Sequence, residues 1–280
     1  MDIHNISMSL IQEFAAFLHG EGRSQGTIEK YTHDVSAFAD WLDDRSVSRE
    51  NAVDWREYLL QSGYAPVTIN SMIASLNSFF RFCGFDCRVK FLKVQRQLFR
   101  EKSKDLSREE YERLLETART EGKNRLALLM ETICASGIRV SEVQYITVEA
   151  AQAGRTTISM KGKIRTILLP GKLCRKLLKY AGKQKIASGE IFLTRSGKSL
   201  SRRQIWAEMK RLCIDANVEP SKVFPHNLRH LFATVFYKAC KDIAKLADVL
   251  GHSSIETTRI YLLTTEKEHQ QQIELLGLVS

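Results

Sequence analysis

The sequence predicts a mainly α-helical protein with two domains, the second of which also holds a small antiparallel sheet. Apolar residues recur with helical spacing through the first domain, the periodicity then stops in a stretch rich in lysine and arginine, and residues 155–169 alternate as a β-hairpin does. At 280 residues the chain suits one large domain or two medium ones. We therefore expect a helical domain over 1–85, a basic linker over 86–105 and a mixed domain over 106–280.

The first domain is predicted to contain four helices. An apolar stripe in SLIQEFAAFL ends at Gly20 and Gly22, and Thr27 opens a second helix. Ser48 can cap a third helix, and Pro66 starts a fourth at a position where its missing N–H would have no partner. Each helix carries its apolar residues on one side, which predicts a small all-helical domain with its own core.

Charge is distributed unevenly along the chain. The net charge is +10, yet residues 1–80 contain 5 Lys/Arg against 11 Asp/Glu, whereas residues 81–104 contain 8 against 2. The positive excess therefore belongs to the linker and the second domain, where it suits a polyanion such as nucleic acid. The linker fits a solvated connection as well as one that lies along a phosphate backbone. For the first domain to bind DNA, its few cations must gather on one face.

Several other classes of protein are disfavoured by the sequence. No apolar run is long enough to cross a bilayer, and the N-terminus lacks the basic and apolar regions of a secretory signal, so we expect a cytoplasmic protein that binds no membrane. The six cysteines are scattered without the spacing of a zinc site, which indicates idle thiols in a reducing compartment.

The second domain is predicted to be mixed but mainly helical. Ser107 opens it with a capping box, because Glu110 lies three residues further on. The hairpin has Lys161-Gly162-Lys163 in its turn, and residues 191–193 are a candidate third strand. Helices are predicted at 108–120, at about 124–135, in a short piece after Gly137, and from Ser201 onwards with breaks at 217–224 and 251–253.

Two segments of this domain carry chemically active side chains. In PHNLRHLFAT, His226 and Arg229 share one face of a helix, with His230 nearby, although a core helix with polar groups at its exposed start would look the same. In LGHSSIETTRIY, Gly251 ends one helix and Ser253 can cap the next, which leaves His252 in the loop between them. Tyr261 follows nine residues later; taken alone, such a tyrosine is usually structural.

Together these residues match the needs of phosphodiester transfer. That reaction needs donors on the nonbridging oxygens, a nucleophile, a group that takes its proton, and an acid for the leaving oxygen. Arg139 and Arg229 would clamp the phosphate, because a guanidinium makes two parallel hydrogen bonds and stays charged. His252 would be a further donor, His226 would take or share the proton of Tyr261, and a lysine in the hairpin turn would protonate the leaving 5′ oxygen.

The motifs ASGIRVSE, PHNLRHLFAT and LGHSSIETTRIY resemble those of the tyrosine recombinase (phage integrase) family, and most closely its Xer-type members. The spacings of 3, 23 and 9 residues from His226 through Arg229 and His252 to Tyr261 are as expected for that family. The segment from SLIQEF to ADWL also resembles the family's helical, SAM-like core-binding domain, so that the resemblance covers nearly the whole chain.

The resemblance implies a role for each matching residue. Arg139 and Arg229 would bind the scissile phosphate, and Tyr261 would attack it to give a 3′-phosphotyrosyl link and a free 5′-hydroxyl. Glu142, one turn after Arg139, matches an acidic position that helps to hold the site together, although a surface salt bridge would also explain it.

The general acid is where the sequence departs from the family pattern. Members commonly read Lys-Gly-Asn-Lys-x-Arg in the turn, whereas this chain has KGKIR, one residue shorter. Lys161 aligns with the family's general acid, and Lys163 is the alternative acid or else a phosphate contact. We expect further DNA contacts from Lys163, Arg165, Arg202 and Arg203.

The resemblance also implies an architecture and partners. The two domains would close as a C-shaped clamp around double-stranded DNA at a specific core site, mostly through phosphate contacts. Four copies would form a homotetramer on paired sites and exchange strands through a Holliday junction. Because the phosphotyrosyl bond conserves energy, neither a metal nor ATP is needed, and the sequence shows neither a carboxylate cluster nor a Walker-type loop.

Some features stay open at the level of sequence. The tail after Tyr261 reads as an amphipathic helix with Ile273, Leu275, Leu276 and Leu278, which would pack on a neighbouring copy or on its own domain. A type IB topoisomerase-like nicking and closing enzyme and an inactive DNA-binding relative are the rival hypotheses. The target site, the need for accessory proteins, and the outcome (integration, excision, inversion or dimer resolution) are not given by the sequence.

Overall fold

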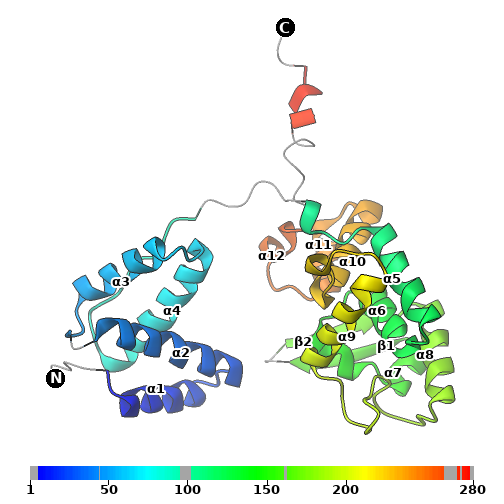
Figure 1. Cartoon of the computed structure of the whole chain (residues 1–280), viewed down its shortest axis with the longest axis horizontal. Helices are drawn as coiled ribbons and strands as arrows, with labels where there is room; N and C mark the ends of the chain where they lie inside the picture. Colours follow the sequence, from blue (N-terminus) through cyan, green and yellow to red (C-terminus); the bar gives the residue numbers. More distant parts are fainter. Residues whose placement is uncertain are drawn as a thin grey trace. The chain divides into compact units, whose positions relative to one another are not determined.

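The computed structural model describes residues 6–43, 45–94, 102–160, 163–261, 270–271 and 273–277. The chain forms two compact units, Met1–Arg96 and Gln97–Ser280 (Figure 1). As predicted, both are mainly helical, and the described residues contain one sheet, which has two antiparallel strands. None of the described helices is both long and apolar enough to cross a membrane.

The first unit contains the four predicted helices around an aromatic core. Ser7 and Ser48 cap two of them, each with its side chain accepting a hydrogen bond from a backbone N–H three residues on. The core is built from large side chains of all four helices, among them Phe14, Phe38 and Trp55. The helices are α1 (Met8–Gly20), α2 (Gln25–Leu42), α3 (Arg49–Gln61) and α4 (Pro66–Cys83).

The chain that follows α4 stays bound to this unit. Asn77 in α4 exchanges two hydrogen bonds of 2.9 Å with the backbone of Val89, whose side chain is buried in the core of the unit. Asn70 in the same helix makes the equivalent pair with the backbone of Leu92, at 2.7 and 3.0 Å. The first part of the basic segment that we predicted as a linker is therefore fixed along α4.

The second unit is mainly helical and has a core of its own. Ser107 and Glu110 form the predicted capping box at the start of its first long helix. Its elements are η1 (Lys102–Lys104), α5 (Arg108–Thr120), α6 (Asn124–Ser136), η2 (Val140–Tyr145), α7 (Val148–Ala153), β1 (Arg155–Met160), β2 (Lys163–Leu168), α8 (Gly171–Lys183), α9 (Arg202–Asp215), η3 (Pro220–Lys222), α10 (Pro225–Cys240), α11 (Ile243–Leu250) and α12 (Ile255–Arg259).

The predicted hairpin is present, but the predicted third strand is not. β1 and β2 pair antiparallel from Arg155 opposite Leu168 to Met160 opposite Lys163. Residues 191–193 are no strand: the backbone here pairs only as isolated bridges, one on each side of Phe192. Phe192 is buried, and an apolar run this short does not distinguish a strand from a buried loop.

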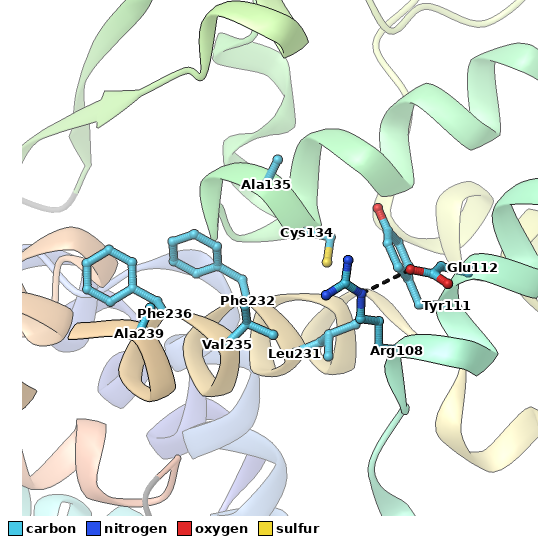
Figure 2. Close-up of a pocket in the computed structure, with 10 residues that line it drawn as sticks. All are labelled: Arg108, Tyr111, Glu112, Cys134, Ala135, Leu231, Phe232, Val235, Phe236 and Ala239. Carbon is cyan, nitrogen blue, oxygen red and sulfur yellow. Dashed lines mark hydrogen bonds and ion pairs between the residues drawn. The ribbon is translucent and has the colours of Figure 1, made fainter. Parts of the chain in front are cut away.

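A hollow with mainly apolar walls lies between α5, α6 and α10 (Figure 2). It measures about 390 Å³, and its walls include Tyr111, Cys134, Phe232 and Phe236. Apolar side chains are also exposed in the described part of the tail: Ile273, Leu275 and Leu276. Both arrangements that we considered for the tail, packing on a neighbouring copy and packing on its own domain, stay predictions.

Candidate active site

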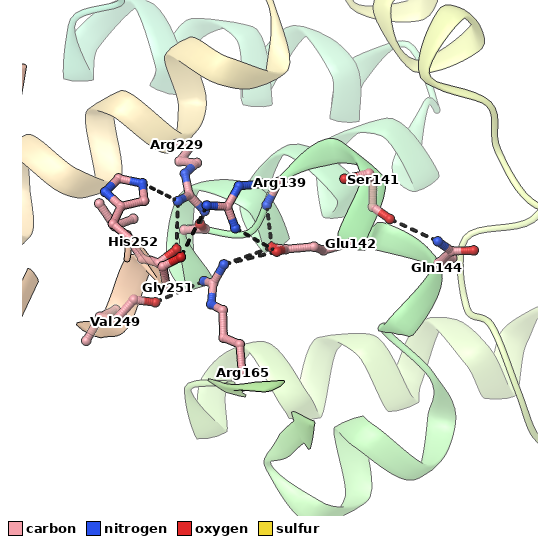
Figure 3. Close-up of polar contacts among 11 residues, drawn as sticks. Arg139, Ser141, Glu142, Gln144, Arg165, Arg229, Val249, Gly251 and His252 are labelled. Carbon is pink, nitrogen blue, oxygen red and sulfur yellow. Dashed lines mark hydrogen bonds and ion pairs between the residues drawn. The ribbon is translucent and has the colours of Figure 1, made fainter. Parts of the chain in front are cut away.

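Arg229 lies at the centre of a polar cluster in the second unit (Figure 3). It follows one turn after the start of α10, and only 3% of the residue is exposed. Its guanidinium donates to the carbonyl oxygens of Gly137 and Leu250, the latter at 2.8 Å, and to Nε2 of His252 at 3.0 Å. A buried charge is tolerated here because several acceptors converge on it.

The carbonyl oxygen of Gly137 reaches Arg229 because of a helix ending that requires glycine. Gly137 ends α6 with a left-handed backbone, at φ 64°. A Cβ atom at this position would lie 2.5 Å from ring atoms of Phe232, so the lack of a side chain also lets α6 and α10 pack closely. This glycine therefore sets both the helix ending and the distance to the Arg229 helix.

Glu142 joins two further arginines on the opposite side of the cluster. Its carboxylate accepts from Arg139 Nη1 at 2.9 Å and from the backbone N–H of Arg139 at 2.8 Å. It also accepts from Arg165 Nη1 at 3.1 and 3.0 Å. Glu142 is buried, which rules out the surface salt bridge that we considered as an alternative. Arg139 keeps 42% of its side chain exposed, so that it can still meet a ligand.

His252 is held as one neutral tautomer. Because arginine can only donate, Nε2 of His252 accepts from Arg229, and the ring proton must lie on Nδ1. Nδ1 then donates to Thr258 Oγ1 at 2.9 Å. Burial, followed by the charges of Arg229 and Arg139, lowers the pKa of His252 from 6.5 to about 4. The imidazole is therefore uncharged near neutral pH.

The same environment affects Arg229 without removing its charge. Burial, followed by the neighbouring charge of Arg139, lowers the pKa of Arg229 to about 10, and the nearby Tyr261 opposes the fall. This pKa is still far above neutral pH, so a positive charge is kept in the interior and is available to an anion.

Tyr261 lies two residues after the end of α12, with its backbone N–H bonded to the carbonyl oxygen of Thr258 at 3.1 Å. The serine that caps α12 is Ser254, which accepts from the N–H of Glu256, and not Ser253 as we predicted. Only 6% of the residue is exposed. Its ring centroid lies 4.9 Å from that of His230 and 6.0 Å from that of His252, and the His252 ring is nearly parallel to it. Four segments of the chain thus bring Arg139, Arg229, His252 and Tyr261 together.

The known family to which this site belongs follows from sequence comparison. The sequence pattern described as "Phage integrase family" matches residues 104–268, which is more than half of the chain and includes the whole cluster. The chain belongs to the phage integrase family. The pattern of the N-terminal SAM-like domain of phage integrases matches residues 11–83, the four-helix unit.

Similar proteins place this phage integrase family member among the tyrosine recombinases, which act in site-specific DNA recombination. It is 32% identical to "Tyrosine recombinase XerA" of Thermococcus kodakarensis, over 96% of both chains. It is 28% identical to "Tyrosine recombinase XerD" of Staphylococcus epidermidis, over 90% of this chain and 93% of the relative.

Solved structures share the fold of this family member. A lambda integrase dimer bound to a COC′ core site has a TM-score of 0.73 at 17% identity, and covers 93% of this chain and 95% of the integrase. XerH recombinase bound to its difH substrate has a TM-score of 0.65 at 17% identity, over 98% of this chain and 90% of XerH.

The remaining residues that we predicted for the recombinase site are placed as follows. One hollow of about 340 Å³ is lined by His226 and Arg202 together with Arg139 and Arg229. Arg203 is exposed in the first turn of α9. Lys161 lies outside the described residues, and of Lys163 only the backbone is described.

Two residues differ from what the sequence led us to expect. We predicted that Arg165 contacts DNA, but only 9% of its side chain is exposed and its guanidinium is engaged by Glu142 and by the carbonyl oxygen of Val249. The strand pattern could not reveal this, because the buried face of β2 carries Arg165 beside Ile167, whereas the exposed face carries the apolar Ile164 and Leu168. His230 was noted only as a neighbour of His226, yet its ring contacts Tyr261; its position one turn after His226 was the available signal.

Proposed function

We propose that this recombinase cuts and rejoins duplex DNA through a covalent link to Tyr261. The observation that supports it is the convergence of Tyr261 with two arginines and a histidine, Arg229 being buried with its charge intact. Such a site offers fixed donors to the nonbridging oxygens of one phosphate, where charge builds up during transfer.

In the proposed step, the phenolic oxygen of Tyr261 attacks phosphorus and the bond to the 5′ oxygen breaks. The phenolic proton passes to His226, and a turn lysine, Lys161 or else Lys163, gives a proton to the departing 5′ oxygen. Arg139 and Arg229 neutralise the charge on the phosphate. The reverse attack by a 5′-hydroxyl of the partner strand restores the DNA, so the step needs no metal or ATP. Two such exchanges would proceed through a Holliday junction.

His252 needs a proton to donate to this phosphate, since its Nε2 is an acceptor in the structure. A phosphate beside the ring would supply negative charge and raise the pKa of His252 from its low value. We therefore propose that DNA binding and the protonation of His252 are coupled.

The first unit is proposed to hold DNA through a cluster of cations. Arg23, Arg81 and Arg88 line one hollow of about 460 Å³ together with Tyr31 and the exposed Phe91. None of the three arginines forms an ion pair with another described residue. This gathering supports the expectation that the few cations of an acidic unit share one face, where they would contact phosphates.

We also propose that four copies assemble on paired sites. The exposed side chains of the tail, such as Leu275, and the hollow beside Phe232 and Phe236 are both apolar. Insertion of the tail of one copy into the hollow of the next would be a heterologous contact, and such contacts form a closed ring when the rotation between copies closes.

The nucleophile can be tested with a suicide duplex that is nicked near the scissile phosphate, so that the cut fragment diffuses away. The wild-type protein should give a covalent protein–DNA adduct on a denaturing gel. Tyr261→Phe should give none while binding the same duplex with similar affinity, because only one oxygen atom is removed. An adduct with the Phe variant would show that another residue attacks.

The same preparation separates recombination from the topoisomerase-like alternative. Relaxation of supercoiled plasmids that carry no core site, without strand exchange between paired sites, would favour a nicking and closing enzyme.

A further inference from the structure

Arg165 occupies a core position of the hairpin. In β2 the side chains alternate: Ile167 lies on the buried face, whereas Ile164 and Leu168 are exposed. Arg165 is on the face of Ile167, directly opposite the buried Ile158 of β1. A charged side chain at such a position needs partners in the interior.

The partners of Arg165 belong to two different parts of the candidate site (Figure 3). Its Nη1 binds both carboxylate oxygens of Glu142, the residue that fixes Arg139. Its Nη2 donates to the carbonyl oxygen of Val249 at 2.9 Å, three residues before His252. One guanidinium therefore links the hairpin to both sides of the polar cluster.

Because Gly251 has no side chain, Arg165 can pack closely against the His252 loop. The backbone of Gly251 is left-handed at φ 64°, and a Cβ atom there would lie 2.3 Å from Cδ and 2.9 Å from Nε of Arg165. The stem of Arg165 thus runs directly against the peptide that precedes His252. The His252 loop is held independently of the hairpin by backbone bonds from Gly251 to Asp248 and from His252 to Ala247, so that Arg165 fixes the hairpin against a supported loop.

We propose that Arg165 is a positioning residue: it anchors the hairpin so that the lysine of its turn reaches the leaving 5′ oxygen. This rests on the proposed function. Among the side chains of β2 that the structure describes, only Arg165 makes hydrogen bonds outside the hairpin. Without it, Glu142 keeps both hydrogen bonds from Arg139, and Arg229 keeps its carbonyl partners. The phosphate clamp would persist, whereas the hairpin would lose its anchor.

The atom that leaves provides a selective test. In the ordinary reaction the bond between phosphorus and the 5′ oxygen breaks, and that oxygen takes a proton. When sulfur replaces this bridging oxygen, the thiolate leaves without a proton, because a thiol has a pKa of about 8.5 whereas the pKa of an alcohol is far higher. A defect in proton delivery should disappear with sulfur, and a defect in phosphate binding should not.

The experiment measures single-turnover cleavage of two nicked suicide duplexes that differ only in the bridging atom. Arg165→Ala should slow cleavage of the oxygen duplex by about 10²-fold, the lower end of what general acid catalysis contributes, and cleave the sulfur duplex within about threefold of wild type. Arg229→Ala should be slow on both duplexes. Thr166→Ala, on the outer face of the same strand, is the matched control and should behave as wild type on both.

Arg165→Lys keeps the charge opposite Glu142, but one ammonium lacks the fork that binds two partners at once. Its cleavage rate on the oxygen duplex should fall between those of wild type and Arg165→Ala. If circular dichroism shows that the Ala variant is unfolded, the Lys variant tests the positioning role in its place. Lys161→Ala and Lys163→Ala identify the lysine that donates the proton: its alanine variant should cleave the oxygen duplex slowly and the sulfur duplex at a rate near that of wild type.

Equal slowing on both duplexes by the folded Arg165 variants would overturn the positioning role alone. A wild-type protein that forms no adduct with either duplex would overturn the proposed function and the positioning role together.

Discussion

His252 combines a lowered pKa with a position beside Tyr261, the proposed nucleophile. Burial and the charges of Arg229 and Arg139 lower its pKa in the folded protein to about 4, against 6.5 in the unfolded chain. The unfolded chain therefore binds the proton more readily between these values. The resulting stability is present above about pH 6.5 and is lost as the pH falls towards 4.

This predicts a pH-dependent difference between wild type and His252→Gln. The wild-type free energy of unfolding should fall more between pH 7 and pH 5 than that of the variant, which has no imidazole to protonate. Urea unfolding at the two pH values measures the difference. A parallel fall in both proteins would contradict the lowered pKa of His252.

At the scale of the elements, the ending of α6 controls the distance to α10. Gly137→Ala would place a Cβ 2.5 Å from the Phe232 ring on a left-handed backbone. The backbone strain costs about 1–2 kcal/mol and the overpacking about 1–3 kcal/mol more. We expect a large fall in Tm, together with weaker cleavage because the Gly137 carbonyl oxygen moves away from Arg229.

Gly154→Ala is the matched control for this prediction. Gly154 ends α7 with φ 69°, but no atom lies within 4 Å of its would-be Cβ, so only the backbone strain applies. Calorimetry should show a clearly smaller fall in Tm for Gly154→Ala than for Gly137→Ala. Equal falls would mean that contact with Phe232 is not limiting.

Elements with a strong apolar period could be predicted from the sequence. Whether a given side chain points inward or outward could not always be predicted. The four helices of the first unit and the capping box at Ser107 were confirmed because apolar spacing and caps are local signals. The inward turn of Arg165 depends on Glu142, 23 residues earlier, and on the backbone at Val249. Such long-range pairing leaves no periodic trace in the sequence, which is also why the contact of His230 with Tyr261 was missed.

At the scale of the whole molecule, DNA affinity should depend on salt through both units. Replacing Arg23, Arg81 and Arg88 with alanine should weaken binding and reduce the slope of log K against log salt by about 0.9 for each phosphate that is no longer neutralised. Arg45→Ala is the control, because this arginine stacks on Trp41 and binds backbone carbonyl oxygens.

Fluorescence anisotropy on a core-length duplex at several salt concentrations measures the slope of log K against log salt for the triple variant and for Arg45→Ala. An unchanged slope in the triple variant would show that the hollow of the first unit does not face phosphates. A slope reduced as much by Arg45→Ala would show that the effect is nonspecific.

The hydrogen bonds of Arg229 also have a consequence for protein synthesis. Its two carbonyl partners, Gly137 and Leu250, lie 92 residues before it and 21 residues after it. A nascent chain that has left the ribosome as far as Arg229 holds a cation whose second acceptor has not yet emerged. The proposed nucleophile emerges later still. A translation product that ends before Leu250 would therefore lack one of the two carbonyl acceptors of Arg229 as well as Tyr261.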